Sequence, residues 1–261
     1  MDMDRIKTVS EYISEGERPE ILFWVGCAGS FDPRAQQVSR AFASLMKIAG
    51  IRFAILGDEE KCTGDPARRA GNEFLFQLLA LQNIETLKNY EITKIVTTCP
   101  HCFNTLKNEY PALGGHYEVV HHTVFLNDLL RDGRLKLAGE IPGGALTYHD
   151  SCYLGRINGI YEDPREIMKQ MNADIREMKR SKAGGLCCGA GGGQMFKEDE
   201  AGSKRINLER VEEALSTGAG TIVSNCPFCL TMLTDGVKAL DQQEKVMVYD
   251  LAELILQQKS P

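Results

Sequence analysis

The 261-residue sequence lacks the features that would place it in a membrane or on nucleic acid. No apolar run approaches the roughly 18 residues that a membrane-spanning helix needs. Acidic side chains outnumber basic ones by 36 to 30, so the net charge of −6 offers no basic excess for phosphate groups. The first residues are charged and lack the apolar stretch of a secretory signal. We therefore expect a cytoplasmic protein that has no membrane span and does not bind nucleic acid.

Nine cysteines stand out against this ordinary composition. A reducing cytoplasm does not support a disulfide framework, and an odd number of cysteines in regular clusters indicates metal binding instead. Two clusters are CxxC pairs with proline in second place, and a third is a vicinal pair in a glycine-rich turn. The clusters and the three single cysteines are Cys99/Cys102, Cys226/Cys229, Cys187/Cys188, and Cys27, Cys62 and Cys152.

The cysteine spacing repeats along the chain. Cys152 follows Cys27 by 125 residues, Cys188 follows Cys62 by 126, and the second CxxC pair follows the first by 127. Such self-similarity predicts a duplicated unit, with the proline- and glycine-containing stretch 137–144 as its joint. We expect an N-terminal arm at 1–19, a first half at 20–138 with four cysteines, and a second half at 139–261 with five.

Short apolar runs alternate with helical patterns in both halves. Strands are expected at 21–25, 51–56, 92–98, 117–121, 145–149, 221–224 and 245–248, with a weak candidate at 175–178. Helices are expected at 33–49, 66–87 and 201–216, after each CxxC pair, and near 130 and 256. The alternation predicts an α/β fold of two tandem pseudo-repeats, each a small parallel sheet flanked by helices. The cysteine loops then lie at the carboxyl ends of the strands, where open α/β sheets bind ligands.

The number of thiols in each half bears on the metal. Four thiolates suit zinc or an iron–sulfur cluster equally well. The second half offers five, and a tetrahedral zinc ion has no use for the fifth. A cluster of several irons can use it, because vicinal sulfurs can reach different irons. A thioredoxin-like CxxC pair would leave the other cysteines without a role. The second half therefore favours an iron–sulfur cluster.

The second-half pattern, Cys152, Cys187-Cys188-Gly189 and Cys226-Pro227-Phe228-Cys229, resembles the cysteine-rich CCG domain of heterodisulfide reductase B-type subunits. It is also similar to iron–sulfur subunits of glycolate and lactate oxidation systems. The first half matches through Cys27, Cys62 and Cys99-Pro100-His101-Cys102. Its stretch 62–73 looks most like the C-terminal region of membrane-bound iron–sulfur oxidoreductases, which are thought to pass electrons between flavoproteins and quinone. The resemblance covers about residues 20–257.

This resemblance implies that all nine cysteines are metal ligands and that the second half holds a non-cubane [4Fe-4S] cluster. The first half departs from the pattern, and we expect Lys61 to stand where its other vicinal cysteine is missing. Four thiolates would remain there for a cubane [4Fe-4S] cluster or for zinc. The ammonium of Lys61 would favour the reduced state of such a cluster and raise its potential.

Other residues near the cysteines carry weaker signals. Backbone N–H groups of Gly189, Gly191 and Gly192 are expected to donate to cluster sulfides. A phosphate cradle would need a following Lys-Ser/Thr pair, which this stretch lacks. His149 could donate to a cluster thiolate or transfer a proton, and is otherwise a strand-end histidine. Arg68 and Arg69 are expected on a solvated helix face.

Together these features predict an electron-transfer subunit of a multi-protein oxidoreductase. The chain lacks a ferredoxin-type run of closely spaced cysteines, so electrons would come from a ferredoxin-like iron–sulfur subunit or a flavoprotein dehydrogenase. The acceptor would be a disulfide or a quinone-linked membrane subunit. Two alternatives remain: a catalytic heterodisulfide reductase subunit, and a zinc-binding structural or interaction module.

Overall fold

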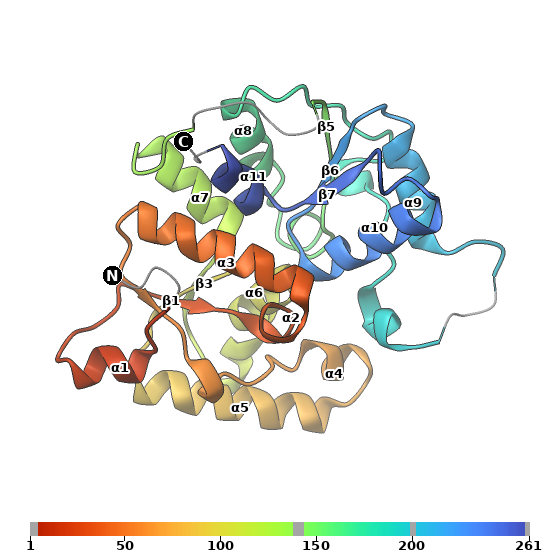
Figure 1. Ribbon diagram of the computed structural model, residues 1–261. Helices are drawn as coiled ribbons and strands as arrows, with labels where there is room; N and C mark the ends of the chain where they lie inside the picture. Colours follow the sequence, from red (N-terminus) through yellow and green to blue (C-terminus); the bar gives the residue numbers. More distant parts are fainter. Residues whose placement is uncertain (1–4, 138–143, 199–201, 259–261) are drawn as a thin grey trace. The chain divides into compact units, whose positions relative to one another are not determined.

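The computed structural model describes residues 5–137, 144–198 and 202–258. The chain divides into two compact units, Met1–Phe125 and Leu126–Pro261. Each unit is an α/β structure built on a parallel sheet, so the expected fold class is confirmed (Figure 1). Most of the expected joint, residues 138–143, lies outside the described residues, and a boundary at 138/139 stays a prediction. In the described part of the chain, every helix is too short or too polar to cross a membrane.

The first unit is built on four parallel strands in the order β2-β1-β3-β4. All four residues of β1 are buried, as expected for a central strand of a sheet covered on both faces. Helices α3 and α5 lie on opposite faces of this sheet (Figure 1). Its strands and helices are α1 (Val9–Ser14), β1 (Ile21–Trp24), α2 (Gly26–Phe31), α3 (Pro33–Ile48), β2 (Phe53–Ala54), α4 (Asp65–Arg69), α5 (Glu73–Asn89), β3 (Lys94–Thr97), α6 (Pro100–Asn104) and β4 (Glu118–His121).

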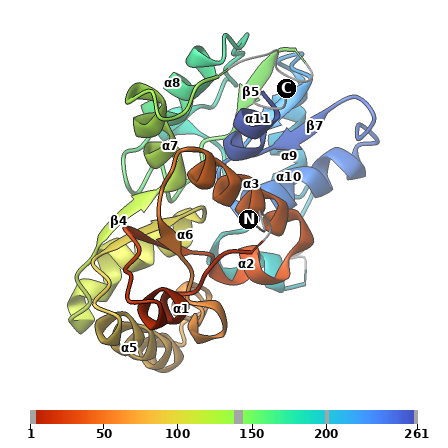
Figure 2. The ribbon, with the colours of Figure 1, turned by 60° about the vertical axis from the view of Figure 1, so that its left-hand side comes forward.

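One expectation for the first unit is wrong: the single long helix expected at 66–87 is two separate helices, α4 and α5. Gly71 adopts a left-handed φ of +85°, and Asn72 then caps α5 by accepting the N–H of Leu75 at 3.0 Å. The N-terminal arm contains the short helix α1, which lies on the same side of the sheet as α5 (Figure 2). Just before α1, Thr8 pairs in parallel with Ile55 and so extends the sheet edge.

The second unit is built on three parallel strands, in the order β5-β6-β7. The weak strand candidate at 175–178 forms only a bridge between Ile175 and Leu146, at the place that β2 occupies beside β1. Ile175 stands between Asp174 and Arg176, so this segment lacks the apolar run of a buried strand. The elements are β5 (Leu146–Tyr148), α8 (Glu162–Gln170), α9 (Ile206–Leu215), β6 (Thr221–Val223), α10 (Pro227–Ala239), β7 (Met247–Tyr249) and α11 (Leu251–Gln257), preceded by α7 (His122–Arg131), which crosses from the first unit.

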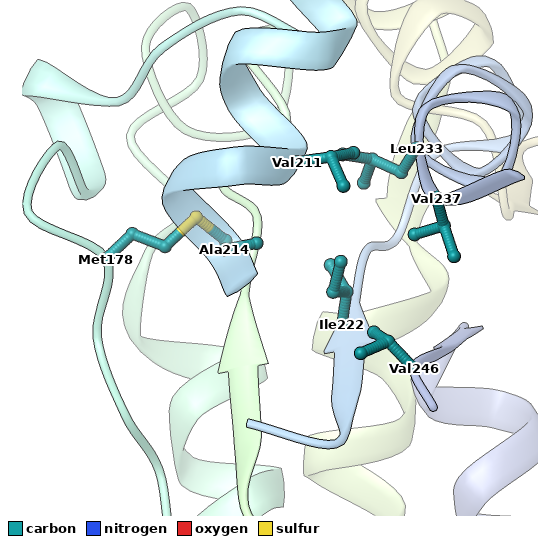
Figure 3. Packing of buried hydrophobic residues seen from close by; sticks show 7 residues of the cluster. All are labelled: Met178, Val211, Ala214, Ile222, Leu233, Val237 and Val246. Carbon is teal, nitrogen blue, oxygen red and sulfur yellow. The ribbon is translucent and has the colours of Figure 1, made fainter. Parts of the chain in front are cut away.

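One face of this smaller sheet is covered by α9 and α10. Ile222 of β6 packs under Val211 and Ala214 of α9 and under Leu233 and Val237 of α10 (Figure 3). This packing fixes the end of β6 relative to the start of α10. The second CxxC pair lies at that junction, because Cys226 precedes the first residue of α10. In both units the cysteines follow the carboxyl ends of the strands, as predicted.

Candidate metal centre

Four thiols meet in the first unit. The thiol of Cys27 is hydrogen-bonded to Cys62, and that of Cys102 to Cys99. Cys102 also lies close enough to Cys27 and Cys62 for their charges to raise its pKa further. Gly26 allows this approach, because a Cβ at that residue would lie 3.2 Å from Cys102 Sγ and its φ is +76°. The structure therefore brings together all four cysteines predicted for this half.

Two of these thiols are poised to ionise. The hydrogen bond from Cys27 lowers the pKa of Cys62 to about 7. The hydrogen bond from Cys102, assisted by the nearby His101, lowers the pKa of Cys99 to about 7. Thiolates are the metal-binding form of cysteine, so the first unit offers two near neutral pH before a metal contributes its own charge.

Five thiols meet in the second unit. Hydrogen bonds connect them in one series: Cys152 to Cys187, Cys187 to Cys188, Cys188 to Cys229, and Cys229 to Cys226. The hydrogen bonds from Cys152 and Cys188 lower the pKa of Cys187 far below that of an ordinary thiol. All five cysteines predicted for the second half thus form one cluster around the vicinal pair.

The two clusters correspond residue by residue, and the correspondence corrects the expectation for Lys61. Gly64 and Gly189, 125 residues apart, are both left-handed, and their N–H groups donate to Cys62 Sγ at 3.5 Å and Cys187 Sγ at 3.3 Å. Cys62 is therefore the counterpart of Cys187, which is also 125 residues away.

It follows that Thr63 occupies the place of Cys188. Its hydroxyl lies 3.9 Å from Cys102 Sγ, much as Cys188 is hydrogen-bonded to Cys229. Lys61 precedes both, is exposed, and donates to the carbonyl of Asp58 at 3.0 Å. The fifth thiol of the first unit is thus replaced by a buried hydroxyl and not by an ammonium group.

The glycine-rich turn has one defined contact with the cysteines. Gly189, expected as a backbone donor to sulfur, donates to Cys187 Sγ. Its φ of +92° favours glycine at this point of the turn. Gly191 and Gly192 follow in the kinked 3₁₀ segment Gly191–Phe196, and their expected contacts with cluster sulfides stay a prediction.

His149 lies beside the second cluster and is held by an arginine that the sequence did not single out. One of its ring nitrogens lies within 4.8 Å of the sulfurs of Cys188 and Cys229. Its Nδ1 accepts the Nε–H of Arg210 at 2.9 Å. Burial, followed by the charge of Arg210, lowers the pKa of His149 to about 3, so the ring is neutral at physiological pH. Both side chains are fully buried or nearly so.

Several polar residues near the first cluster form hydrogen bonds and ion pairs with one another. Asp65 Oδ2 lies 2.8 Å from the Nδ1 of His101. Arg68 and Arg69 lie on α4 as expected, and both are partly exposed and ion-paired. Arg68 pairs with Glu109 at 2.8 Å, and Arg69 pairs with both Glu109 and Asp65. These ion pairs stabilise the stretch that follows Cys62.

The donor set and its surroundings fit an anionic cluster held by soft ligands. None of the nine cysteines, all within the described residues, forms a disulfide. Among the buried side-chain nitrogens without a hydrogen bond in the described residues are Nε1 of Trp24 in the first unit and Nη2 of Arg210 in the second, both of which can only donate. Buried donors without acceptors are rare in proteins, and sulfide or thiolate sulfurs would accept from them.

The sequence of the chain matches one family profile over residues 21–107 and 146–234, described as a cysteine-rich CCG domain. The chain belongs to this family. The resemblance seen in the cysteine pattern is therefore confirmed. The two matched segments fall in the two compact units and include all the cysteines of both clusters.

Three curated relatives are longer than this chain. The chain is 49% identical over 253 residues to the probable iron-sulfur-binding oxidoreductase FadF of Bacillus subtilis, covering 97% of this chain and 36% of the relative. It is 47% identical to EtfAB:quinone oxidoreductase of Syntrophomonas wolfei, covering 92% and 34%. It is 34% identical to a dihydromethanophenazine:CoB--CoM heterodisulfide reductase subunit of Methanosarcina barkeri, covering 97% and 62%. The chain thus spans about a third of the first two relatives.

Proposed function

We propose that this chain is an iron–sulfur electron-transfer subunit or region of a multi-protein oxidoreductase in the cytoplasm. It passes electrons between a flavoprotein or ferredoxin-like partner and a quinone-linked or disulfide acceptor. The nine cysteines are the ligands, with Cys27, Cys62, Cys99 and Cys102 holding a cubane [4Fe-4S] cluster. The five thiols of the second unit hold a non-cubane [4Fe-4S] cluster.

The observation that carries this proposal is the different number of thiols gathered in the two units, four against five. Tetrahedral zinc is satisfied by four, so a zinc-binding module explains the first unit but not the second. Iron–sulfur clusters, when bound, accept and return single electrons. The relatives, which include a probable iron-sulfur-binding oxidoreductase and a quinone oxidoreductase, support the same class of activity.

A second candidate function is reduction of a disulfide by this chain itself. Cys152 and Cys187 are only partly buried, whereas Cys188, Cys226 and Cys229 are buried. One side of the second cluster is therefore within reach of a small sulfur compound. The match to a heterodisulfide reductase subunit supports this alternative.

Metal analysis of anaerobically purified protein tests the proposed function. We expect about eight irons and a similar number of sulfides per chain, about four for each cluster, with different EPR signals for the two. About four irons with one zinc would leave the first unit structural. Zinc alone, without an EPR signal, would contradict the proposal. Reoxidation of dithionite-reduced protein by a small heterodisulfide would favour the reductase over the relay.

Removal of iron is expected to lower the melting temperature substantially. The cysteine loops place several ionisable thiols in contact, and the metal offsets their mutual repulsion. The measurement compares thermal unfolding before and after treatment with a chelator in air, followed by circular dichroism with iron analysis of the same samples. An unchanged transition after complete iron loss would show that the clusters add nothing to stability.

A further inference from the structure

We infer that Arg210 fixes the proton of His149 on Nε2, and that this N–H donates to a sulfur of the second-unit cluster and raises its reduction potential. The inference rests on the proposed cluster in the second unit. His149 is then a positioning and tuning residue and not a metal ligand, although its ring nitrogen, with Cys188 and Cys229, forms a group of metal-binding geometry.

The hydrogen bond from Arg210 decides the tautomer. A guanidinium group has only donors and stays protonated in proteins, so Nδ1 of His149 must be the acceptor of the 2.9 Å bond from Nε. A neutral imidazole carries one proton, which therefore lies on Nε2. A protonated nitrogen cannot ligate a metal. The same nitrogen can donate to a thiolate or sulfide.

Other contacts of Arg210 stabilise its hydrogen bond to His149. It is fully buried, and its Nη1 donates to the carbonyl of Arg180 at 2.8 Å and to Glu213 at 3.1 Å. Glu213 is itself fixed, because it accepts the backbone N–H and the Nε–H of Arg180. The arrangement connects α9 to the end of β5 and leaves Nε2 as the ring nitrogen of His149 without a hydrogen bond in the described part of the chain.

The first unit has a related feature at the equivalent place. Trp24 is 125 residues before His149, and both lie three residues before the first cysteine of their unit. Its indole can donate one hydrogen bond and can never ligate a metal. Its Nε1 is buried without an acceptor among the described residues. A ring N–H that only donates is therefore present before the first cysteine of both units, and Arg210 gives a histidine this property.

Redox titration of the second-unit EPR signal tests the inference in a double-mutant cycle. The variants are His149→Phe, Arg210→Met, the double variant, and His149→Gln, which keeps a side-chain N–H. A hydrogen bond to a charged acceptor predicts that His149→Phe lowers the reduced-to-oxidised ratio at a fixed potential about tenfold, or about 59 mV for one electron. His149→Gln should recover most of this loss. The Arg210→Met shift should fall to less than half in the His149→Phe background, because only the direct effect of the charge remains.

Three results would overturn the inference. A potential unchanged by His149→Phe would mean that the histidine does not tune the cluster, and fully additive shifts of the two substitutions would mean that Arg210 does not act through the histidine. Loss of second-unit iron in both His149→Phe and His149→Gln would mean that the imidazole is a ligand. Failure of the proposed function has a separate signature, which is absence of second-unit iron from the unsubstituted protein.

Discussion

Replacing Cys188 with threonine is expected to abolish the distinct EPR signal of the second unit and to leave two clusters of one spectroscopic kind. The substitution gives the second unit the residue that the first unit has at the equivalent place, Thr63. Four thiols remain, the number that the first unit supplies. The iron content should stay at about eight per chain, because a cubane [4Fe-4S] cluster needs only four cysteine ligands.

The reciprocal variant, Thr63→Cys, provides the matched control. Thr63 is buried, and its hydroxyl already lies 3.9 Å from Cys102 Sγ, so a thiol there would join the other four. We expect the first unit to acquire the second kind of EPR signal. Lys61→Cys should not do so, because Lys61 is exposed and its side chain extends toward the backbone carbonyl of Asp58, to which its ammonium group donates. A new signal in Lys61→Cys but not in Thr63→Cys would contradict the assigned correspondence.

Replacing Arg165 with methionine is expected to lower the free energy of unfolding by about 3–5 kcal/mol. Arg165 donates to both oxygens of Asp150, at 2.8 and 2.9 Å, and the side chains are only 4% and 3% exposed. Without Arg165, the carboxylate of Asp150 stays buried with its charge unpaired. Asp150 lies between β5 and the first cysteine of the second unit, so this ion pair also stabilises the cysteine loop.

Lys182→Met is the control for this prediction. It removes the ion pair between Lys182 and Glu162, whose side chains are 48% and 58% exposed. An exposed pair contributes at most about 1 kcal/mol. Urea unfolding of samples with equal iron content would measure both variants. Equal losses of stability would show that the buried Arg165–Asp150 pair contributes no more to the free energy of unfolding than the exposed Lys182–Glu162 pair.

The location of the cysteines at the carboxyl ends of strands could be predicted because the apolar runs of the strands and the spacing of the cysteines agree. Buried parallel strands appear in the sequence as continuous apolar runs, and the runs at 21–25, 92–98, 145–149 and 221–224 end shortly before a cysteine. The prediction of one helix at 66–87 is wrong because the helical pattern continues through residues 70–72. A left-handed glycine and a capping asparagine divide it there. Gly71-Asn72 is the sequence signal that marks this division.

The finer features of the site required three-dimensional contacts. The expectation for Lys61 aligns Cys62 with the second residue of the vicinal pair. The left-handed glycines Gly64 and Gly189 show that it aligns with the first. In the sequence, Arg210 resembles an ordinary surface charge on a helix, since arginine is rarely buried without a partner. Only the structure shows that its partners are His149, Glu213 and the carbonyl of Arg180.

The position of Trp24 makes the tryptophan fluorescence of the protein sensitive to the first-unit cluster. It is the only tryptophan in the chain, it is fully buried, and it lies three residues before Cys27. An iron–sulfur cluster that absorbs at the wavelengths of indole emission quenches a nearby indole. Fluorescence excited in the tryptophan band should therefore rise when the first unit loses its cluster. The second unit contains no tryptophan of its own.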